Sequence, residues 1–329
     1  MAADHRAVDP QCHRESGALR YRRVRTARAC RATVEGRRIT AERHRGVTVP
    51  TFQHRGRTVV YDRWGAGPPL VLLHNAGTQR HIWDEQVAAL RRTREVFALD
   101  LPGFGESDQP ADGYRLADYV HMLEDFLIEQ RRTGVVLVGN CLGAATSLSY
   151  AMAHPELVRA LVLINPLTRN TVYGGRSAPL VWADTLLPLG PLAERLELPR
   201  PLISRIINDQ LGSRGRARKL GRAPKLTAHW GDRGRLRALH GMVQDFENYR
   251  ALDTFTPPSD FPPLCTIWGA QNRILSARAG ADLNRTLRPQ ASAVLDDCGH
   301  LPMVENPERV TAIITEFLAS EAVARPLAQ

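Results

Sequence analysis

The chain has 329 residues, of which 43% are hydrophobic and 24% are charged, and its formal net charge is +10. This composition is typical of a soluble globular protein. No segment approaches the roughly 20 consecutive apolar residues that a membrane-spanning helix needs, so we expect no membrane span. The five cysteines show no CxxC spacing, and we find no apolar leader. These features favour the reducing cytoplasm and exclude a disulfide framework or a cysteine metal site.

Residues 1–46 carry most of the positive charge. They hold twelve arginines against five acidic residues, show no apolar periodicity, and have Tyr21 as their only aromatic residue. Such a composition predicts a basic, disordered arm. We interpret this arm as a solvated segment, or as sequence upstream of the true start. Binding of nucleic acid is the less favoured alternative.

From residue 47 onward, strand and helix patterns alternate along the chain. Residues 47–53 and 58–64 predict two strands joined by a turn at Arg55 and Gly56. Apolar runs typical of buried strands begin at residues 70, 96, 135, 161 and 263, and helical patterns occupy 82–92, 116–131, 141–154, 277–286 and 307–320. This alternation predicts an α/β fold, with a mostly parallel sheet and helices on both faces.

The sequence Gly-Asn-Cys-Leu-Gly at 139–143 follows one of these strands and begins a helix. A strand that turns sharply into a helix leaves no room for a Cβ atom at the glycines, and it strains the backbone of the central residue. The Cys141 thiol is then held at a helix N-terminus, which favours the thiolate. The spacing therefore predicts a nucleophile elbow with a cysteine nucleophile. The alternative is a glycine-rich turn that carries a buried structural cysteine.

Three further motifs stand out, and two of them lie at the ends of predicted strands. Asp-Leu-Pro-Gly-Phe-Gly-Glu-Ser-Asp at 100–108 follows the strand from residue 96, and we assign this turn a structural role. Trp-Gly-Ala-Gln-Asn at 268–272 follows the strand from residue 263. Cys-Gly-His-Leu-Pro at 298–302 is followed by Glu-Asn-Pro-Glu at 305–308, where the last helix begins.

Together these motifs resemble the α/β-hydrolase superfamily, which carries an Asp-x-Pro-Gly-x-Gly-x-Ser turn, a Gly-x-Ser-x-Gly elbow and a terminal histidine loop in this chain order. The resemblance implies the α/β-hydrolase fold, with a core formed by residues 47–165 and 255–322. The strand pattern lapses over residues 166–254, which resemble the helical cap inserted after the sixth strand. The two positions at which the family places its acid are Asn272 and Asn165 in this chain.

The resemblance places Cys141, Asn272 and His300 where the family has serine, aspartate and histidine. A thiol can pass its proton to histidine before it attacks, which gives a thiolate–imidazolium pair. The third residue then only has to orient the ring, and an asparagine carbonyl oxygen can accept the imidazole Nδ1–H. We therefore predict a working thiol triad. The alternatives are decay of a former serine enzyme, or a triad completed by Asp296 or Asp297.

The resemblance also implies an oxyanion hole made by the backbone N–H groups of Leu142 and Ala76. Ala76 belongs to the sequence His-Asn-Ala-Gly at 74–77, which has Asn75 where the family has glycine. Two interpretations of Asn75 stay open. Its side chain is a polar contact for the substrate, or the residue only tolerates a left-handed turn.

The predicted function is covalent acyl chemistry through Cys141, without cofactor or metal. The acyl group of an ester, lactone or thioester would be hydrolysed, transferred or cyclised. Dienelactone hydrolases are similar in having an elbow cysteine. The alternative is a catalytically inactive member that binds a small molecule in the same pocket. Residues 213–225 carry six basic residues and no acid, which predicts a solvated loop or a docking patch for coenzyme A or an acyl-carrier protein.

Overall fold

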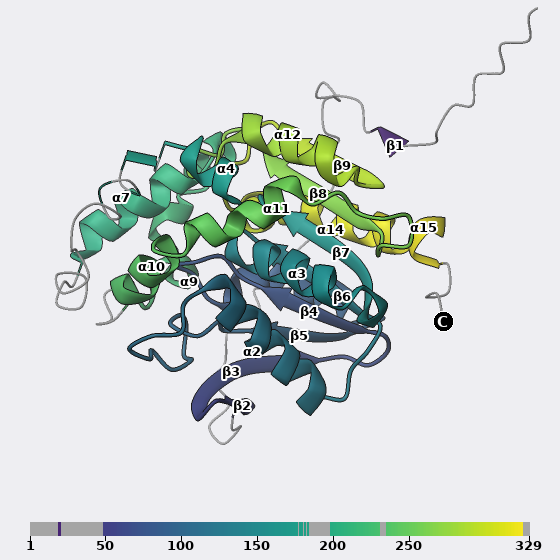
Figure 1. Ribbon diagram of the computed structural model, residues 1–329. Helices are drawn as coiled ribbons and strands as arrows, with labels where there is room; N and C mark the ends of the chain where they lie inside the picture. Colours follow the sequence, from purple (N-terminus) through teal and green to yellow (C-terminus); the bar gives the residue numbers. More distant parts are fainter. Residues whose placement is uncertain are drawn as a thin grey trace, which may run out of the picture.

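A nine-stranded sheet in the order β1-β9-β8-β7-β6-β4-β5-β3-β2 forms the centre of the computed structural model (Figure 1). The structure describes residues 19–20, 49–176, 178–179, 181, 183, 198–230 and 235–324. The strands are β1 (Leu19–Arg20), β2 (Thr51–His54), β3 (Arg57–Trp64), β4 (Pro69–Leu73), β5 (Glu95–Leu99), β6 (Val135–Asn140), β7 (Val158–Ile164), β8 (Leu264–Gly269) and β9 (Ala291–Leu295).

All neighbouring strands from β5 to β1 pair in parallel, whereas β2 and β3 form an antiparallel hairpin at the opposite edge. Every residue of β5, β6 and β8 is buried. Parallel strands covered on both faces are expected to be continuous apolar runs, and these strands have that pattern. Because the strands are parallel, the loops after β4, β6, β7, β8 and β9 meet at one edge of the sheet.

Helices cover both faces of the sheet and bury two separate hydrophobic clusters. Helices α2 (Leu116–Glu129), α3 (Leu142–Ala153) and α12 (Ala277–Leu287) contribute to the first cluster. Helices α1 (Asp84–Leu90) and α14 (Pro307–Leu318) contribute to the second, and they pack against each other. The remaining short elements of the core are η1 (Arg80–Trp83), η2 (Pro155–Leu157), α13 (Pro302–Glu305) and α15 (Glu321–Ala324).

The described part of residues 166–254 contains helices and turns but no strand. Its elements are α4 (Arg169–Tyr173), α7 (Arg200–Gln210), α8 (Ser213–Ala217), η3 (Leu220–Arg222), α9 (Pro224–Thr227), α10 (Arg235–Val243), η4 (Phe246–Tyr249) and α11 (Arg250–Thr254). Several of these helices lie beside the sheet, at left in Figure 1. We call residues 166–254 the predicted cap.

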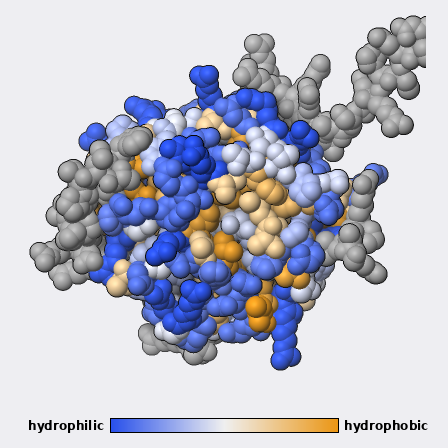
Figure 2. All heavy atoms as spheres, in the orientation of Figure 1, coloured by the Kyte–Doolittle hydropathy of each residue, from blue (hydrophilic) through white to orange (hydrophobic). Residues whose placement is uncertain are grey.

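Two residues of the predicted arm fall within the described part of the chain. Leu19 and Arg20 form β1 and pair in parallel with Ala291 and Ser292 of β9, a strand that the sequence did not predict. The predicted disorder of residues 1–46 otherwise lies outside the described residues. Among those described, no helix is long and apolar enough to cross a membrane. Hydrophilic side chains cover most of the described surface on the face that Figure 2 shows.

Candidate active site

Cys141 lies between β6 and α3, in a strained backbone conformation. Its φ of 52° and ψ of −107° are unfavourable for a residue with a side chain. A Cβ atom on Gly139 would collide with the backbone of Gly143, and one on Gly143 would collide with the backbone of Leu73. The local geometry is therefore that of a sharp strand-to-helix elbow, and both glycines have the steric role that the sequence predicted.

The Cys141 thiol is buried, with only 5% of the residue exposed. The backbone N–H groups of Leu142 and Ala76, the two predicted oxyanion donors, both donate to its sulfur atom. Burial raises the pKa of the Cys141 thiol to about 12, and the two N–H donors oppose this effect without overcoming it. The resting thiol is therefore neutral at physiological pH, with two backbone donors already directed at the reacting atom.

His300 follows β9 and is also buried, with 2% of the residue exposed. Its backbone N–H donates to Gln210 O at 2.7 Å, and its carbonyl accepts from Asn140 Nδ2 at 3.3 Å and Asn165 Nδ2 at 3.1 Å. Burial lowers the pKa of the imidazole to about 3. The sequence predicted a preformed thiolate–imidazolium pair with Cys141. Burial favours the neutral form of both groups, which opposes such a pair in the resting site, and the pair stays a prediction.

The side chain of Asn272 closes a turn. Its Oδ1 accepts from the backbone N–H groups of Ile274 at 3.0 Å and Leu275 at 3.1 Å, which is a typical use of asparagine before a helix. Asn272 Nδ2 and His300 Nδ1 are both buried without a hydrogen-bond partner. The predicted bond from His300 Nδ1–H to the Asn272 carbonyl oxygen is therefore absent, because the turn already uses that oxygen.

The carboxylates near His300 in the sequence do not take the place of Asn272 as the partner of the imidazole. Asp297 forms an ion pair with Arg214, with 3.2 Å between Oδ2 and Nη1. Asp296 contributes its backbone carbonyl to Gln271. Since His300 Nδ1 has no partner, no carboxylate of the described residues completes the triad.

Asn165, at the family's alternative acid position, has a structural role. It adopts a left-handed conformation with φ of 43°. Its Oδ1 accepts from Gly269 N at 3.1 Å, and its Nδ2 donates to the carbonyls of Gly299 at 3.2 Å and His300. Asn165 therefore fastens the end of β7 to the end of β8 and to the loop that follows β9. Sequence reasoning gave it no such role, although a polar residue at a strand end was the available signal.

Glu305 was also missed as a site residue. Its buried carboxylate accepts from the N–H groups of Gly299 at 2.8 Å and Leu301 at 3.3 Å, which flank His300, and from Gly212 at 2.6 Å in the predicted cap. Burial raises the pKa of Glu305, and the backbone donors oppose that shift. The side chain thus joins the histidine loop to the predicted cap. Its position five residues after the histidine was the only sequence signal.

The basic segment at 213–225 forms the short helices α8, η3 and α9 rather than a loop, and most of its residues are exposed, as the interpretation of a solvated segment expects. Arg218 Nη1 donates to the carbonyls of Val304 at 2.9 Å and Glu305 at 2.8 Å. Arg214 Nε donates to the same Glu305 carbonyl at 3.2 Å. These bonds fasten the segment to the end of α13 and use part of the hydrogen-bonding capacity of each guanidinium group. Docking of a phosphorylated carrier stays a prediction.

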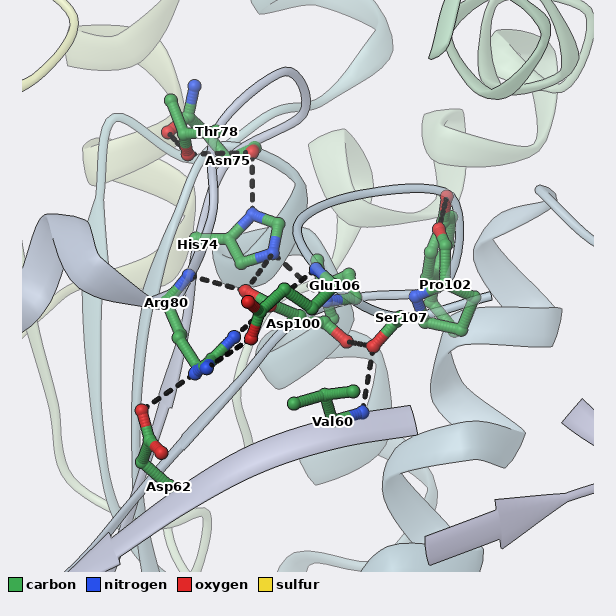
Figure 3. A network of polar contacts seen from close by, with 12 residues as sticks. Val60, Asp62, His74, Asn75, Thr78, Arg80, Asp100, Pro102, Glu106 and Ser107 are labelled. Atoms are coloured by element: carbon green, nitrogen blue, oxygen red, sulfur yellow. Dashed lines mark hydrogen bonds and ion pairs between the residues drawn. The ribbon is translucent and has the colours of Figure 1, made fainter. Parts of the chain in front are cut away.

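A buried polar network supports the loop at 74–77, which contains the predicted oxyanion donor Ala76 (Figure 3). Arg80 forms ion pairs with Asp100, with Asp62 at 2.7 Å and with Glu106 at 2.7 Å. Burial lowers the pKa of Arg80, but the three carboxylates outweigh it and the pKa is raised overall. His74 Nε2 accepts from Leu101 N at 2.9 Å, so Nδ1–H donates to the Asn75 carbonyl at 2.8 Å. The turn at 100–108 thus has the structural role that we predicted.

Asn75 bonds within its own loop. Its Oδ1 accepts from Thr78 Oγ1 at 2.7 Å, and its Nδ2 donates to the Ala76 carbonyl at 3.0 Å. It is not among the described residues with positive φ, so the left-handed interpretation is wrong. Its contact with a substrate stays a prediction.

A pocket of about 580 Å³ lies elsewhere, between the hairpin turn at Arg55 and Arg57, the loop before α2, and α10. It contains none of the predicted catalytic residues, so we do not assign the reaction to it. Among the described residues, no group of three or more histidine, cysteine or acidic side chains is arranged to hold a metal ion.

Residues 70–313 match the model of the alpha/beta hydrolase family. The chain belongs to this family. It is 28% identical over 272 residues to 2-hydroxymuconate semialdehyde hydrolase of Pseudomonas putida. The aligned region covers 80% of this chain and 91% of that protein. The chain is 26% identical over 294 residues to an uncharacterized protein of Mycobacterium tuberculosis, which covers 83% of each chain.

Solved structures share the fold. An α/β-hydrolase fold protein from Burkholderia ambifaria superposes with a TM-score of 0.69 at 21% identity, covering 81% of this chain and 97% of the other. The enol-lactonase from Burkholderia xenovorans LB400 superposes with a TM-score of 0.67 at 19% identity, covering 82% and 100%. At these identities the likeness establishes the fold alone.

Proposed function

We propose that this protein is a hydrolase that forms a covalent acyl intermediate on Cys141 and releases it to water. The observation that carries the proposal is the convergence of the Ala76 and Leu142 N–H groups on the sulfur of a strained elbow cysteine. When sulfur attacks a carbonyl carbon, negative charge develops on the carbonyl oxygen, one bond away. Donors fixed beside the sulfur are placed to stabilise that charge.

Because the resting thiol is neutral, its proton has to leave during the attack. As the bond from Cys141 sulfur to the carbonyl carbon forms, the thiol proton passes to His300 Nε2, and the resulting imidazolium then protonates the leaving group. Water attacks the thioester, with His300 as base, and the thiol is regenerated. This sequence needs the tautomer with Nδ1–H, and no acceptor fixes that tautomer here. We therefore expect slower acylation than in a triad with a carboxylate.

The named relatives support a hydrolase. One is named 2-hydroxymuconate semialdehyde hydrolase, another is named 2-hydroxy-6-oxo-2,4-heptadienoate hydrolase, and a structural neighbour is named enol-lactonase. We propose an ester, lactone or thioester as the substrate of this chain. Transfer of the acyl group to an alcohol, amine or thiol, or its cyclisation, would use the same intermediate, with water excluded.

The acid–base side of the site favours a second candidate, a protein that binds a small molecule without turning it over. His300 Nδ1 and Asn272 Nδ2 lack partners, and both Cys141 and His300 are neutral at rest. A bound ligand can satisfy such groups without any reaction. The pocket of a former enzyme would then serve as a receptor.

Intact-mass spectrometry with a panel of activated esters, lactones and acyl thioesters tests the proposal. Wild-type protein should gain the mass of the acyl group, and Cys141→Ala should gain none while it still binds the substrate. Cys265→Ala, which removes a buried cysteine in β8, is the matched control and should keep the adduct. Added alcohol, amine or pantetheine then separates hydrolysis from transfer by the products formed. If wild type binds ligands without an adduct, and Cys141→Ala binds them equally, the receptor function replaces the hydrolase.

A further inference from the structure

The pocket of about 580 Å³ that contains none of the predicted catalytic residues is lined mainly by charged and polar side chains. Its ionic lining residues come from the hairpin turn, the loop before α2 with the start of that helix, and α10, and they are Arg55, Arg57, Asp112, Arg115, Asp118 and Arg237. Four arginines against two aspartates leave an excess of positive charge. Pockets of this volume commonly hold small molecules. We call it the arginine pocket.

The two aspartates neutralise only part of the positive charge. Asp112 forms an ion pair with Arg57, with 2.5 Å between Oδ1 and Nη2, but its side chain is 83% exposed. Asp118 Oδ1 lies 3.9 Å from Arg55 Nη1, and its Oδ2 accepts from the Arg115 N–H at 3.1 Å. Among the described residues, no carboxylate forms an ion pair with the Arg115 guanidinium. Exposed ion pairs contribute little free energy, so an anionic ligand can compete with both aspartates.

The Arg57 guanidinium is positioned before any ligand binds. Arg57 begins β3, and its Nη1 donates to the Asp112 carbonyl at 3.1 Å. A Cβ atom on Gly113 would collide with this Nη1, and Gly113 also has a φ of 87°, so glycine is required there. The guanidinium is therefore held against the loop before α2, which reduces the entropy lost when a ligand binds.

Another part of the lining comes from α10 of the predicted cap. Arg237 and His240 are three residues apart on this helix, so their side chains share a face. A Cβ atom on Gly241 would lie 3.0 Å from the Tyr114 side chain, so α10 packs directly against the loop before α2. The arginine pocket therefore spans the core and the predicted cap, and one ligand can contact both.

We propose that the arginine pocket binds a phosphate group, and that its ligand is the phosphate ester of a small molecule. Guanidinium groups bind phosphate oxygens through pairs of parallel hydrogen bonds, and the double charge of a phosphate ester matches the excess positive charge. The volume of about 580 Å³ exceeds what phosphate alone fills, which leaves room for the organic part. The inference goes beyond the proposed function and does not depend on it, because no residue of the predicted triad or oxyanion hole lines this pocket.

Calorimetry with the full chain at low ionic strength tests the inference. The probes are phenyl phosphate, glycerol phosphate, inorganic phosphate, and succinate, which carries its charge on two separate carboxylates. At least one phosphate ester should bind with a Kd of about 1 mM or lower, and about tenfold more tightly than succinate. Equal binding of succinate and every ester overturns the inference. Inorganic phosphate should bind more weakly than the ester because it leaves most of the pocket unfilled, and binding as tight as that of the ester would assign the pocket to free phosphate instead.

Variants show whether the arginine pocket is the place of binding. Arg57→Gln and Arg115→Gln should each weaken binding of the ester about tenfold, since each removes a guanidinium that can bond to the phosphate. Asp112→Asn should tighten binding about threefold, because the pocket loses a negative charge. A variant that merely damaged the fold could not produce that gain.

The matched control is Arg169→Gln. The Arg169 side chain is 26% exposed and pairs with an exposed carboxylate, that of Glu247. The pair of Arg57 and Asp112 is similar, with an arginine that is 28% exposed, but Arg169 does not line the arginine pocket. Arg169→Gln should change binding by less than about twofold. No binding of any phosphate ester at about 10 mM overturns the inference, as does binding that Arg57→Gln, Arg115→Gln and Arg169→Gln weaken equally or not at all.

Discussion

The two halves of the candidate site differ in whether their polar side chains have hydrogen-bond partners. On the oxyanion side, a buried network around Asp100 and Arg80 holds the loop that contains Ala76, and its polar side chains are partnered (Figure 3). On the acid–base side, His300 Nδ1 and Asn272 Nδ2 are buried without partners. The backbone of the histidine loop is nonetheless firmly bonded. The difference lies in the side chains that would move a proton.

This contrast separates two contributions to catalysis. Fixed donors stabilise developing charge without any change in protonation, so the oxyanion side works in its resting form. Acid–base catalysis needs a histidine with a pKa near the working pH and a defined tautomer. His300 meets neither condition in the empty site, because burial lowers its pKa to about 3 and no acceptor holds Nδ1–H. The predicted oxyanion donors are thus in place at rest, whereas no acceptor fixes the tautomer of His300, the predicted base.

The largest effect is expected from the oxyanion side. Asp100→Ala leaves the buried guanidinium of Arg80 without its most buried partner and should lower the free energy of unfolding by about 3–5 kcal/mol. Glu106→Gln changes a partner of the same guanidinium whose side chain is 46% exposed, and it should cost less than about 1 kcal/mol. Urea denaturation measures both. Similar costs for the two variants would show that the network does not depend on burial.

A pH series sharpens the description of the acid–base side. The pKa of His300 is lowered by burial from 6.5 to about 3, so below pH 6.5 the unfolded chain binds a proton that the folded protein does not. Stability is therefore lost as pH falls from 6.5 toward 3, by about 1.4 kcal/mol per pH unit for this group. Between about pH 6 and about pH 4, wild type should lose about 2–3 kcal/mol more than His300→Gln. Parallel curves for the two proteins would show that His300 is charged when folded.

Asn272→Asp should supply the carboxylate that the candidate triad lacks. One carboxylate oxygen of the new aspartate keeps the bonds to Ile274 and Leu275. The other oxygen is an acceptor in the place of the unpartnered Asn272 Nδ2 donor. A negative neighbour favours the imidazolium of His300, so acylation of Cys141 should become about tenfold faster, which corresponds to about 1.4 kcal/mol. Stopped-flow mass or absorbance measurements with an activated ester follow this rate. An unchanged or slower rate would mean that residue 272 does not act on His300.

The smallest effect concerns the basic segment that fastens the predicted cap to the histidine loop. Arg218→Gln removes hydrogen bonds to the Val304 and Glu305 carbonyls and should cost about 1 kcal/mol of stability. Any loss of activity should be the same, within about twofold, for a coenzyme A thioester and for a small uncharged ester, because the contact is internal. A selective rise in KM for the coenzyme A thioester would instead support the docking patch.

The sequence predicted the parts of the fold that depend on local pattern. The helices expected at 116–131 and 307–320 correspond to α2 (Leu116–Glu129) and α14 (Pro307–Leu318), and the elbow at Cys141 has the expected strain. Apolar periodicity and glycine spacing are properties of short segments, so they can be read without tertiary structure.

The predictions that the structure does not support depend on burial and on individual hydrogen bonds. The neutral state of Cys141 and His300 follows from burial, which no motif reveals. The orientation of the Asn272 amide is set by two N–H groups in its turn, so its residue type alone gave the wrong hydrogen bond. Glu305 accepts a hydrogen bond from Gly212, 93 residues earlier in the chain, and the Trp230 ring lies against Gly77, so only the folded chain shows these contacts.

The most direct test is the pH dependence of Cys141 alkylation by iodoacetamide, followed by peptide mapping. Because only the thiolate reacts, the rate reports the fraction of Cys141 that is deprotonated. A buried neutral thiol with a pKa of about 12 should be slow at pH 7, and its rate should rise with pH up to the highest pH at which the protein stays folded. A rate that reaches a plateau below pH 7 would contradict the account, since it would show a preformed thiolate–imidazolium pair.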